Sequence, residues 1–285
     1  MDFTSEYRAK LGTPEDAANL VKSGDWVEYG NGTTFAVECD KALAKRRDEL
    51  FDVKLRGQIV YGPIEVVECD PTGEHFCYNA WHASGYDRKL MDQGKAYFSP
   101  MIFRNLAWYH REFLHVNVAF VCATPMDKHG YFSMSTVGSA SQALLHKAKH
   151  IIVEVNKNLP RALNSPMVHI SQIDGLYENH VPLVCLPKAE IDETSKTIGG
   201  LIAERIPDGA TLQLGIGAVP DAVGLALKHK HDLGIHTEMF TDSMVELIEC
   251  GAVNNSKKPI HTGKTVATFA FGSQRIYDLI DDNPA

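Results

Sequence analysis

The stretch PDGATLQLGIGAVPDAVGLALKHKHDLGIHTEMFTD, from Pro207 to Asp242, decides the fold. Its hydrophobic pattern predicts a buried strand, a glycine turn, a helix and a second strand, at residues 211–214, 215–217, 220–230 and 235–240. A parallel crossover needs roughly 10–12 residues, and this one is long enough to form a β-α-β unit. We therefore expect the carboxyl ends of the two strands to lie side by side, with Glu238 facing the glycine loop.

The glycine loop predicts a ligand site, because open α/β sheets bind ligands at the carboxyl ends of their strands. Its two glycines let a ligand approach the backbone, and the free N–H groups of the following helix favour an anionic or carbonyl-oxygen partner. The dinucleotide fingerprint G-x-G-x-x-G is absent, because Pro220 stands where its third glycine is needed. A nicotinamide cofactor is therefore disfavoured.

Glu238 lies between Thr237 and Met239, in a segment whose apolar residues are expected to be buried. A structural interpretation is that Glu238 is an exposed strand residue or pairs with a lysine or arginine elsewhere. A chemical interpretation is that it is a nucleophile. A glutamate carboxylate has a reference pKa of about 4.3, so it is ionised at neutral pH and can attack an acyl carbon without a general base.

A resemblance favours the chemical interpretation. The segments QLGIGAVPDAV (Gln213 to Val223) and HTEMFTDSMVEL (His236 to Leu247) resemble the acetyl-CoA hydrolase/transferase family of coenzyme A transferases. Within that family, the chain is most similar to the butyryl-CoA:acetate and 4-hydroxybutyrate CoA-transferases. The similarity runs along the whole chain, including SGDWVEYG, DKHGYFSMSTVGSASQ and VNKNLPRALNSPMVHISQID at residues 23–30, 127–142 and 155–174.

The family implies a ping-pong reaction through Glu238 as the catalytic residue. In this reaction an acyl-CoA and a short-chain carboxylate such as acetate exchange coenzyme A through a glutamyl-CoA thioester. Coenzyme A is then a co-substrate, and no cofactor is bound permanently. The family also implies that five residues lie against the coenzyme: Gln213, Leu214, Gly215, Ile216 and Gly217.

Several functions stay open at this point. The donor can be butyryl-CoA, 4-hydroxybutyryl-CoA or another short acyl-CoA, since one methylene or hydroxyl in a pocket is worth only about 1–3 kcal/mol. A hydrolase would use the same Glu238, but water instead of a second carboxylate would react with the enzyme–CoA thioester. A coenzyme-binding module without activity would keep the glycine loop and tolerate loss of Glu238.

Composition excludes other classes of protein. The chain has 285 residues, 44% of them hydrophobic, and a formal net charge of −8, which argues against a nucleic-acid partner. No apolar run approaches the roughly 20 residues of a membrane span, and the first residues form no signal core, so we expect a cytoplasmic protein without a membrane partner. The six cysteines form no CxxC pair, and His146 and His150 lack the acidic partner of a zinc motif, so no metal site is expected.

The domain organisation is predicted to be duplicated. SGDWVEYGNG (residues 23–32) repeats the glycine spacing of PDGATLQLGIG (residues 207–217), and each sits in a strand-loop-helix context. We expect an α/β protein with two tandem open domains of the CoA-transferase (NagB/RpiA-like) type, at residues 1–187 and 188–285. The first glycine loop, with Tyr29 and Asn31, would line the acyl side of the cleft.

The resemblance also predicts that the second domain is incomplete. Members of the family continue well beyond the equivalent of Ala285. A domain of this length would leave strands and apolar faces uncovered. We therefore expect a truncated or cleaved product, whose partner is a second copy in a homodimer or a complementing C-terminal fragment.

Overall fold

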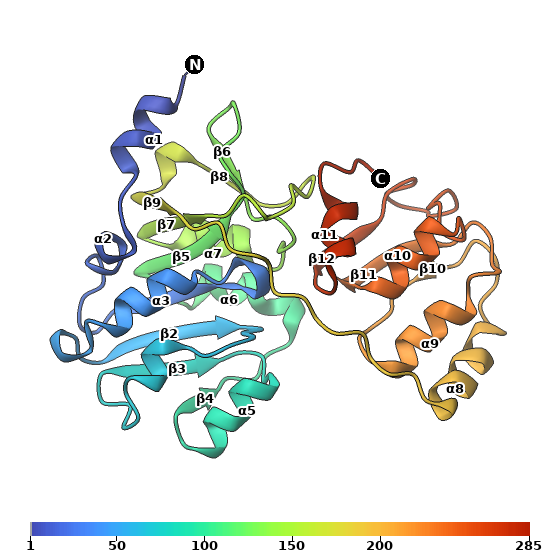
Figure 1. The fold of residues 1–285 in the computed structure, drawn as a ribbon, viewed down its shortest axis with the longest axis horizontal. Helices are drawn as coiled ribbons and strands as arrows, with labels where there is room; N and C mark the ends of the chain where they lie inside the picture. Colours follow the sequence, from blue (N-terminus) through green and yellow to red (C-terminus); the bar gives the residue numbers. More distant parts are fainter. Residues whose placement is uncertain (1) are drawn as a thin grey trace. The chain divides into compact units, whose positions relative to one another are not determined.

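The computed structural model describes residues 2–285 and confirms the α/β class (Figure 1). The chain forms two compact units. Unit 1 contains residues up to Leu159 together with Ser165–Val184, and unit 2 contains Pro160–Asn164 and Cys185–Ala285. The α-helices are α1 (Thr4–Lys10), α2 (Pro14–Ala18), α3 (Val37–Ala44), α4 (Glu65–Glu68), α5 (Gly85–Asp92), α6 (Leu106–Glu112), α7 (Ser141–Lys147), α8 (Glu193–Ala203), α9 (Ala218–Ala226), α10 (Asp242–Glu249) and α11 (Gln274–Ile280).

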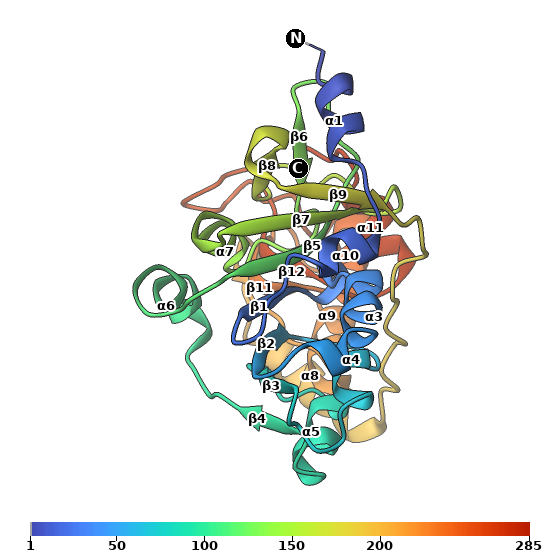
Figure 2. The same ribbon diagram turned by 90° about the vertical axis from the view of Figure 1, so that its left-hand side faces the viewer.

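Unit 1 is built on a seven-stranded parallel sheet with the order β4-β3-β2-β1-β5-β7-β9 (Figure 2). Its strands are β1 (Trp26–Asn31), β2 (Val53–Gln58), β3 (Phe76–Ala80), β4 (Ala96–Phe98), β5 (Val118–Ala123), β7 (His150–Val155) and β9 (Gly175–Glu178). A separate antiparallel pair joins β6 (Tyr131–Ser133) to β8 (Met167–His169). The strands β5 and β7 pair in parallel, and α7 lies between them in the sequence.

The central strand β5 shows why this sheet is covered on both faces. All six of its residues are buried, as is typical of a strand inside a parallel sheet. Val118 and Phe120 pack into one hydrophobic cluster, whereas Ala119 and Val121 pack into the other. Because successive side chains of a strand point to opposite faces, these alternating residues join the sheet to two layers of core.

The strand order of unit 1 reverses direction at β1. From β1 the chain adds β2, β3 and β4 on one side, and later adds β5, β7 and β9 on the other. At such a reversal, the connections that follow the two adjacent strands run to opposite sides and leave a crevice between them. This crevice, at the carboxyl ends of the strands, is the usual ligand site of an open sheet. In unit 1 this crevice lies beyond β1 and β5.

Unit 2 contains a three-stranded parallel sheet formed by β10 (Thr211–Leu212), β11 (Gly234–Phe240) and β12 (Val266–Ala270), in sequence order. The predicted β-α-β unit is confirmed, although β10 is two residues shorter than expected and α9 begins earlier, at Ala218. Both crossovers step in the same direction. Because parallel crossovers are right-handed, α9 and α10 cover the same face of this sheet.

Residues 160–164 belong to unit 2 although they lie within the sequence of unit 1. The backbone N–H of Arg161 donates to the Asp281 carboxylate at 2.7 Å. In return the backbone N–H of Asp282 donates to the Arg161 carbonyl.

In residues 2–285, no helix is long and apolar enough to cross a membrane.

Candidate functional site

The glycine loop and β11 lie side by side, as the sequence predicts. Leu212 pairs with Ile235 in parallel register, and two residues further on the Thr237 hydroxyl donates to the Leu214 carbonyl at 3.3 Å. Glu238 follows Thr237 directly. The loop Gln213–Gly217 therefore leaves the sheet beside the strand segment that carries Glu238.

Alternation along β11 decides where the Glu238 side chain points. Ile235, Thr237 and Met239 are buried, whereas His236 and Glu238 are exposed. Leu214 lies beside Thr237, two residues beyond the Leu212–Ile235 pair. A Cβ atom placed on Gly224 of α9 would contact both the Leu214 side chain and Ser243 of α10. The buried set of β11 therefore faces α9 and α10. Glu238 therefore stands on the face of the sheet that these two helices do not cover.

This exposure changes the energetics of Glu238. A solvated carboxylate does not carry the desolvation cost that an uncompensated buried charge would. Within residues 2–285 no lysine or arginine forms an ion pair with it, so of the two structural alternatives the structure shows the exposed strand residue. A solvated carboxylate without a cationic partner is free to act as a nucleophile or simply to remain in water.

The loop itself has the geometry of a backbone-binding turn. Gly217 has φ of +115°, a conformation that residues with a Cβ rarely adopt. Ile216 is 61% exposed and Gln213 and Gly215 are also exposed, while Leu214 is buried. No side chain caps the start of α9, so its first N–H groups are available to an acceptor.

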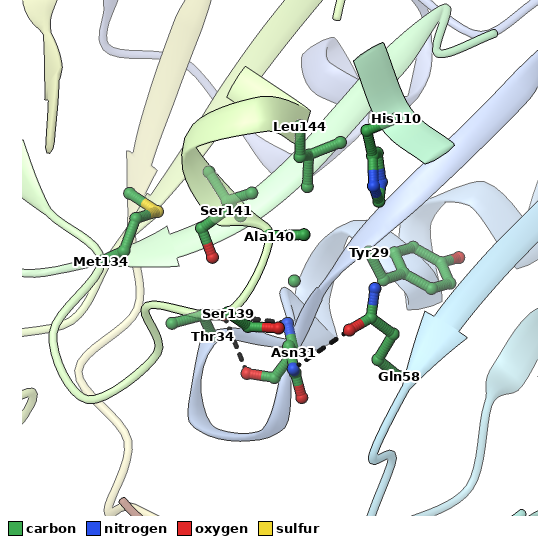
Figure 3. A pocket seen from close by; sticks show the side chains of 12 residues that line it. Tyr29, Asn31, Thr34, Gln58, His110, Met134, Ser139, Ala140, Ser141 and Leu144 are labelled. Atoms are coloured by element: carbon green, nitrogen blue, oxygen red, sulfur yellow. Dashed lines mark hydrogen bonds between the residues drawn. The ribbon is translucent and has the colours of Figure 1, made fainter. Parts of the chain in front are cut away.

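Unit 1 contains a pocket at the carboxyl ends of β1, β2 and β5, in the crevice where the strand order reverses (Figure 3). Asn31 and Gln58 are register partners on β1 and β2, and one hydrogen bond of 3.2 Å joins their side-chain amides. Figure 3 shows this pair on one side of the pocket and Ser141 and His110 elsewhere on its rim. The lining residues are Tyr29, Gly30, Asn31, Thr34, Gln58, His110, Val121, Met134, Ser139, Ala140, Ser141 and Leu144.

A buried ionic cluster lies against this pocket. Glu28 and Arg56 are register partners on β1 and β2, and Arg56 donates to one Glu28 carboxylate oxygen at 2.9 Å. His110 of α6 faces the other oxygen with Nε2 at 2.8 Å and the Leu106 carbonyl with Nδ1 at 3.0 Å. Glu28 is 2% exposed, Arg56 is 5% exposed and His110 is fully buried.

The cluster holds its members ionised. Burial acts to raise the pKa of Glu28, but the hydrogen bond and charge of His110, with those of Arg56, hold that pKa below its usual value. Burial likewise acts to lower the pKa of His110, and Glu28 outweighs it and raises that pKa. The Arg56 guanidinium also stacks 4.0 Å from the ring centre of Trp26.

Comparison with known proteins places these features in a family. The family model of the acetyl-CoA hydrolase/transferase N-terminal domain matches residues 1–186. The chain belongs to the acetyl-CoA hydrolase/transferase family. Butyryl-CoA:acetate CoA-transferase of Anaerostipes caccae is 40% identical over 295 residues, covering 100% of this chain and 65% of that relative. The 4-hydroxybutyrate coenzyme A transferase of Clostridium kluyveri is 36% identical over 285 residues, covering 100% and 66%.

Two solved structures share the fold of this chain. RipA from Yersinia pestis has a TM-score of 0.93 and 32% identity, covering 100% of this chain and 69% of that one. A 4-hydroxybutyrate CoA-transferase from Porphyromonas gingivalis has a TM-score of 0.82 and 28% identity, covering 99% and 68%. This member of the acetyl-CoA hydrolase/transferase family thus spans slightly less than two thirds of the length of Anaerostipes caccae butyryl-CoA:acetate CoA-transferase.

Sequence reasoning places the glycine loop and Glu238 next to each other, and names Tyr29 and Asn31 as lining residues of a site in the first part of the chain. It misses Gln58, His110 and the Glu28–Arg56 pair. The available signal was a charged residue inside each of two largely apolar strands: Glu28 in WVEYG, and Arg56, two residues after Lys54, in VKLRGQ. Without pairing information, these charges are indistinguishable from solvated ones.

Proposed function

We propose that this protein is a CoA-transferase that moves coenzyme A between a short-chain acyl-CoA, such as butyryl-CoA, and a carboxylate, such as acetate. The single observation that carries the proposal is the exposed Glu238 beside the glycine loop Gln213–Gly217. Membership of the acetyl-CoA hydrolase/transferase family and relatives that are named CoA-transferases support it.

The proposed reaction begins when a Glu238 oxygen attacks the thioester carbonyl of the acyl-CoA. The C–S bond breaks, coenzyme A leaves as a thiolate, and a mixed anhydride joins the acyl group to Glu238. The thiolate then attacks the glutamyl carbonyl, which releases the acyl group as a carboxylate and leaves a glutamyl-CoA thioester. An incoming carboxylate reverses both steps and departs as the new acyl-CoA.

The glycine loop would serve the coenzyme side of this reaction, through Gln213, Leu214, Gly215, Ile216 and Gly217. Its backbone lies open next to Glu238, and the uncapped N–H groups at the start of α9 offer donors to a carbonyl oxygen that gains negative charge. Coenzyme A enters as a co-substrate in this proposal, and no permanently bound cofactor takes part.

Intact and peptide mass spectrometry after incubation with butyryl-CoA tests the proposal. We expect a coenzyme A adduct on the peptide that contains Glu238, and its discharge by acetate. Glu238→Ala should abolish the adduct. Glu204→Ala is the matched control, since Glu204 is an exposed glutamate at the end of α8 in the same unit, and it should leave the adduct intact.

The family also contains hydrolases, and an acyl-CoA hydrolase is the second candidate. The exposure of Glu238 favours it, because water can reach that carboxylate in unit 2. Discharge of the adduct by water at the same rate with and without acetate would establish hydrolysis. Coenzyme A binding without any adduct would instead identify an inactive binding module.

We further propose the setting in which this enzyme acts. Residues 1–187 and 188–285 are tandem CoA-transferase domains, and the protein works in the cytoplasm as a homodimer or with a complementing C-terminal fragment. A donor of the 4-hydroxybutyryl type is the alternative to butyryl-CoA. Light scattering of the purified chain, with and without the C-terminal third of a full-length relative, distinguishes the assemblies.

A further inference from the structure

Unit 2 contains a buried lysine that the proposed reaction does not use. Lys258 is 3% exposed, and in residues 2–285 it forms no ion pair with a carboxylate. Its ammonium group donates instead to two backbone carbonyls, that of Ile235 at 2.7 Å and that of Lys264 at 2.5 Å. A buried charge without a counter-ion is costly, which points to a role for the contacts that this ammonium group makes.

Lys258 and Asn255 together bind both backbone polar groups of Ile235, the second residue of β11. The Asn255 side chain, also buried, accepts the Ile235 N–H at 2.9 Å, while Lys258 binds the carbonyl. The strand β12 begins only at Val266, opposite His236. Because the N–H and C=O of one strand residue point to the same side, the two side chains replace the strand residue that β12 lacks opposite Ile235.

The loop between α10 and β12 fixes these two side chains from its own side. The Asn255 amide donates to the Thr265 hydroxyl at 3.0 Å, and the Asn255 carbonyl accepts the Gly263 N–H. The Thr262 hydroxyl donates to the Lys258 carbonyl at 2.8 Å. Asn255 and Lys258 therefore connect a hydrogen-bonded loop to the start of β11.

Gly234, the first residue of β11, makes room for this arrangement. A Cβ atom at this position would lie 2.5 Å from Cγ of Lys258, which is closer than non-bonded carbon atoms approach. Only a residue without a side chain lets the Lys258 stem pass and reach the Ile235 carbonyl. The glycine and the lysine thus depend on each other, although 24 positions separate them in the sequence.

We propose that Lys258 and Asn255 are positioning residues, which hold the start of β11 and thereby place Glu238 beside the glycine loop. Glu238 follows Ile235 by three residues, about 10 Å along the strand. On its other side β11 pairs with β10 at only two residues.

The displacement that these contacts prevent is a small one. The alternation of buried and exposed residues along β11 already opposes a slip by a whole residue. A shift of about 1 Å leaves that alternation intact, yet such a misplacement of a reacting group can slow a reaction about 100-fold. The catalytic consequence of the two positioning residues rests on the reaction proposed above.

Lys258→Met tests the role of the ammonium group, because methionine keeps most of the apolar stem. At saturating butyryl-CoA, we expect the coenzyme A adduct to form at least about tenfold more slowly per folded molecule. The half-saturating concentration should stay unchanged, since the glycine loop is intact. Lys257→Met is the matched control at the adjacent, exposed lysine, and it should react like the wild type. A wild-type rate per folded molecule in Lys258→Met would overturn the proposal, even if its Tm is lowered.

Two further variants complete the test, with circular dichroism to verify folding. Lys258→Ala removes the atoms of a propylammonium ion, so n-propylammonium chloride should accelerate this variant more than sodium chloride at the same concentration. Thr265→Val removes one bond to Asn255 at a half-buried loop position and should slow the adduct about threefold. If Lys258→Met does not fold, a wild-type rate in Thr265→Val refutes the proposal.

Hydrogen exchange separates the positioning role from the reaction. Amides of β11 should exchange at least about tenfold faster in Lys258→Met than in the wild type, and at the wild-type rate in Lys257→Met. This difference in a chain that never forms an adduct would sink the reaction and leave the hold on β11 standing. Adduct formation and exchange at wild-type rates in Lys258→Met would do the reverse.

Discussion

The Asp40 carboxyl is buried beside Tyr29, whose hydroxyl donates to it. Burial raises the pKa of Asp40 to about 6, although Tyr29 and the backbone N–H groups of Glu65 and Val66 oppose the shift. The native state therefore holds a proton that the unfolded state releases at lower pH. By linkage, this group costs stability progressively as pH rises from about 4 to about 6, by up to about 3 kcal/mol, and no further above that range.

Asp40→Asn should remove this pH dependence. We expect the difference in unfolding free energy between wild type and Asp40→Asn to shift against the wild type from pH 4 to pH 6 and to stay level above about pH 7. Urea unfolding across this range measures it. Asp48→Asn, at an exposed carboxylate, is the control. A difference that does not vary with pH would contradict the prediction.

Gly217 offers a second test on a single residue, because its backbone conformation alone demands glycine. Its φ is +115° and nothing would contact an added Cβ, so Gly217→Ala should cost only backbone strain, about 1–3 kcal/mol of stability. Gly200 of α8 also has open space but an ordinary helical backbone, and Gly200→Ala should stabilise by about 0.5–1 kcal/mol. Thermal unfolding should show shifts of opposite sign, and shifts of the same sign would disprove the distinction.

At the scale of elements, β1 and β2 depend on the ion pair that joins them. Glu28→Ala would leave Arg56 and His110 buried without their carboxylate, which costs about 3–5 kcal/mol. Glu15→Ala removes an exposed partner of Lys45 and should cost no more than about 1 kcal/mol. Denaturant unfolding of the two variants compares them directly, and equal losses would mean that the buried cluster adds nothing beyond a surface pair.

The same elements show how far sequence reasoning reaches. The parallel pair β10–β11 and the position of Glu238 next to the glycine loop follow from apolar runs, glycine placement and crossover length, which are local signals. The Glu28–Arg56–His110 cluster does not follow from them. Its members are 28 and 82 residues apart along the chain, and only strand register and the packing of α6 bring them together. The predicted end of β10 and the predicted start of β11 differ from the observed ones by two residues and one residue. Hydrogen bonding, not hydrophobicity, decides where a strand ends.

At the scale of the whole molecule, residues 181–192 connect the two units without a helix or strand until α8 begins at Glu193. Most of these residues are exposed, and such segments are preferred sites of proteolysis. Brief trypsin treatment should therefore cut first after Lys188, giving fragments 1–188 and 189–285 by mass spectrometry. Lys188→Gln should remove this cut. A first cut inside either sheet would contradict the division into two units.

The five residues from Pro160 to Asn164 have a consequence for anyone who wishes to move this architecture between proteins. Unit 2 is not one uninterrupted stretch of the gene, because Arg161 bonds to Asp281 and Asp282 near the end of the chain. A transferred segment that begins at Cys185 lacks residues 160–164 and their bonds to the end of the chain. Chimeras of this family would do better to exchange residues 160–164 together with the C-terminal unit, so that the graft carries its own tether.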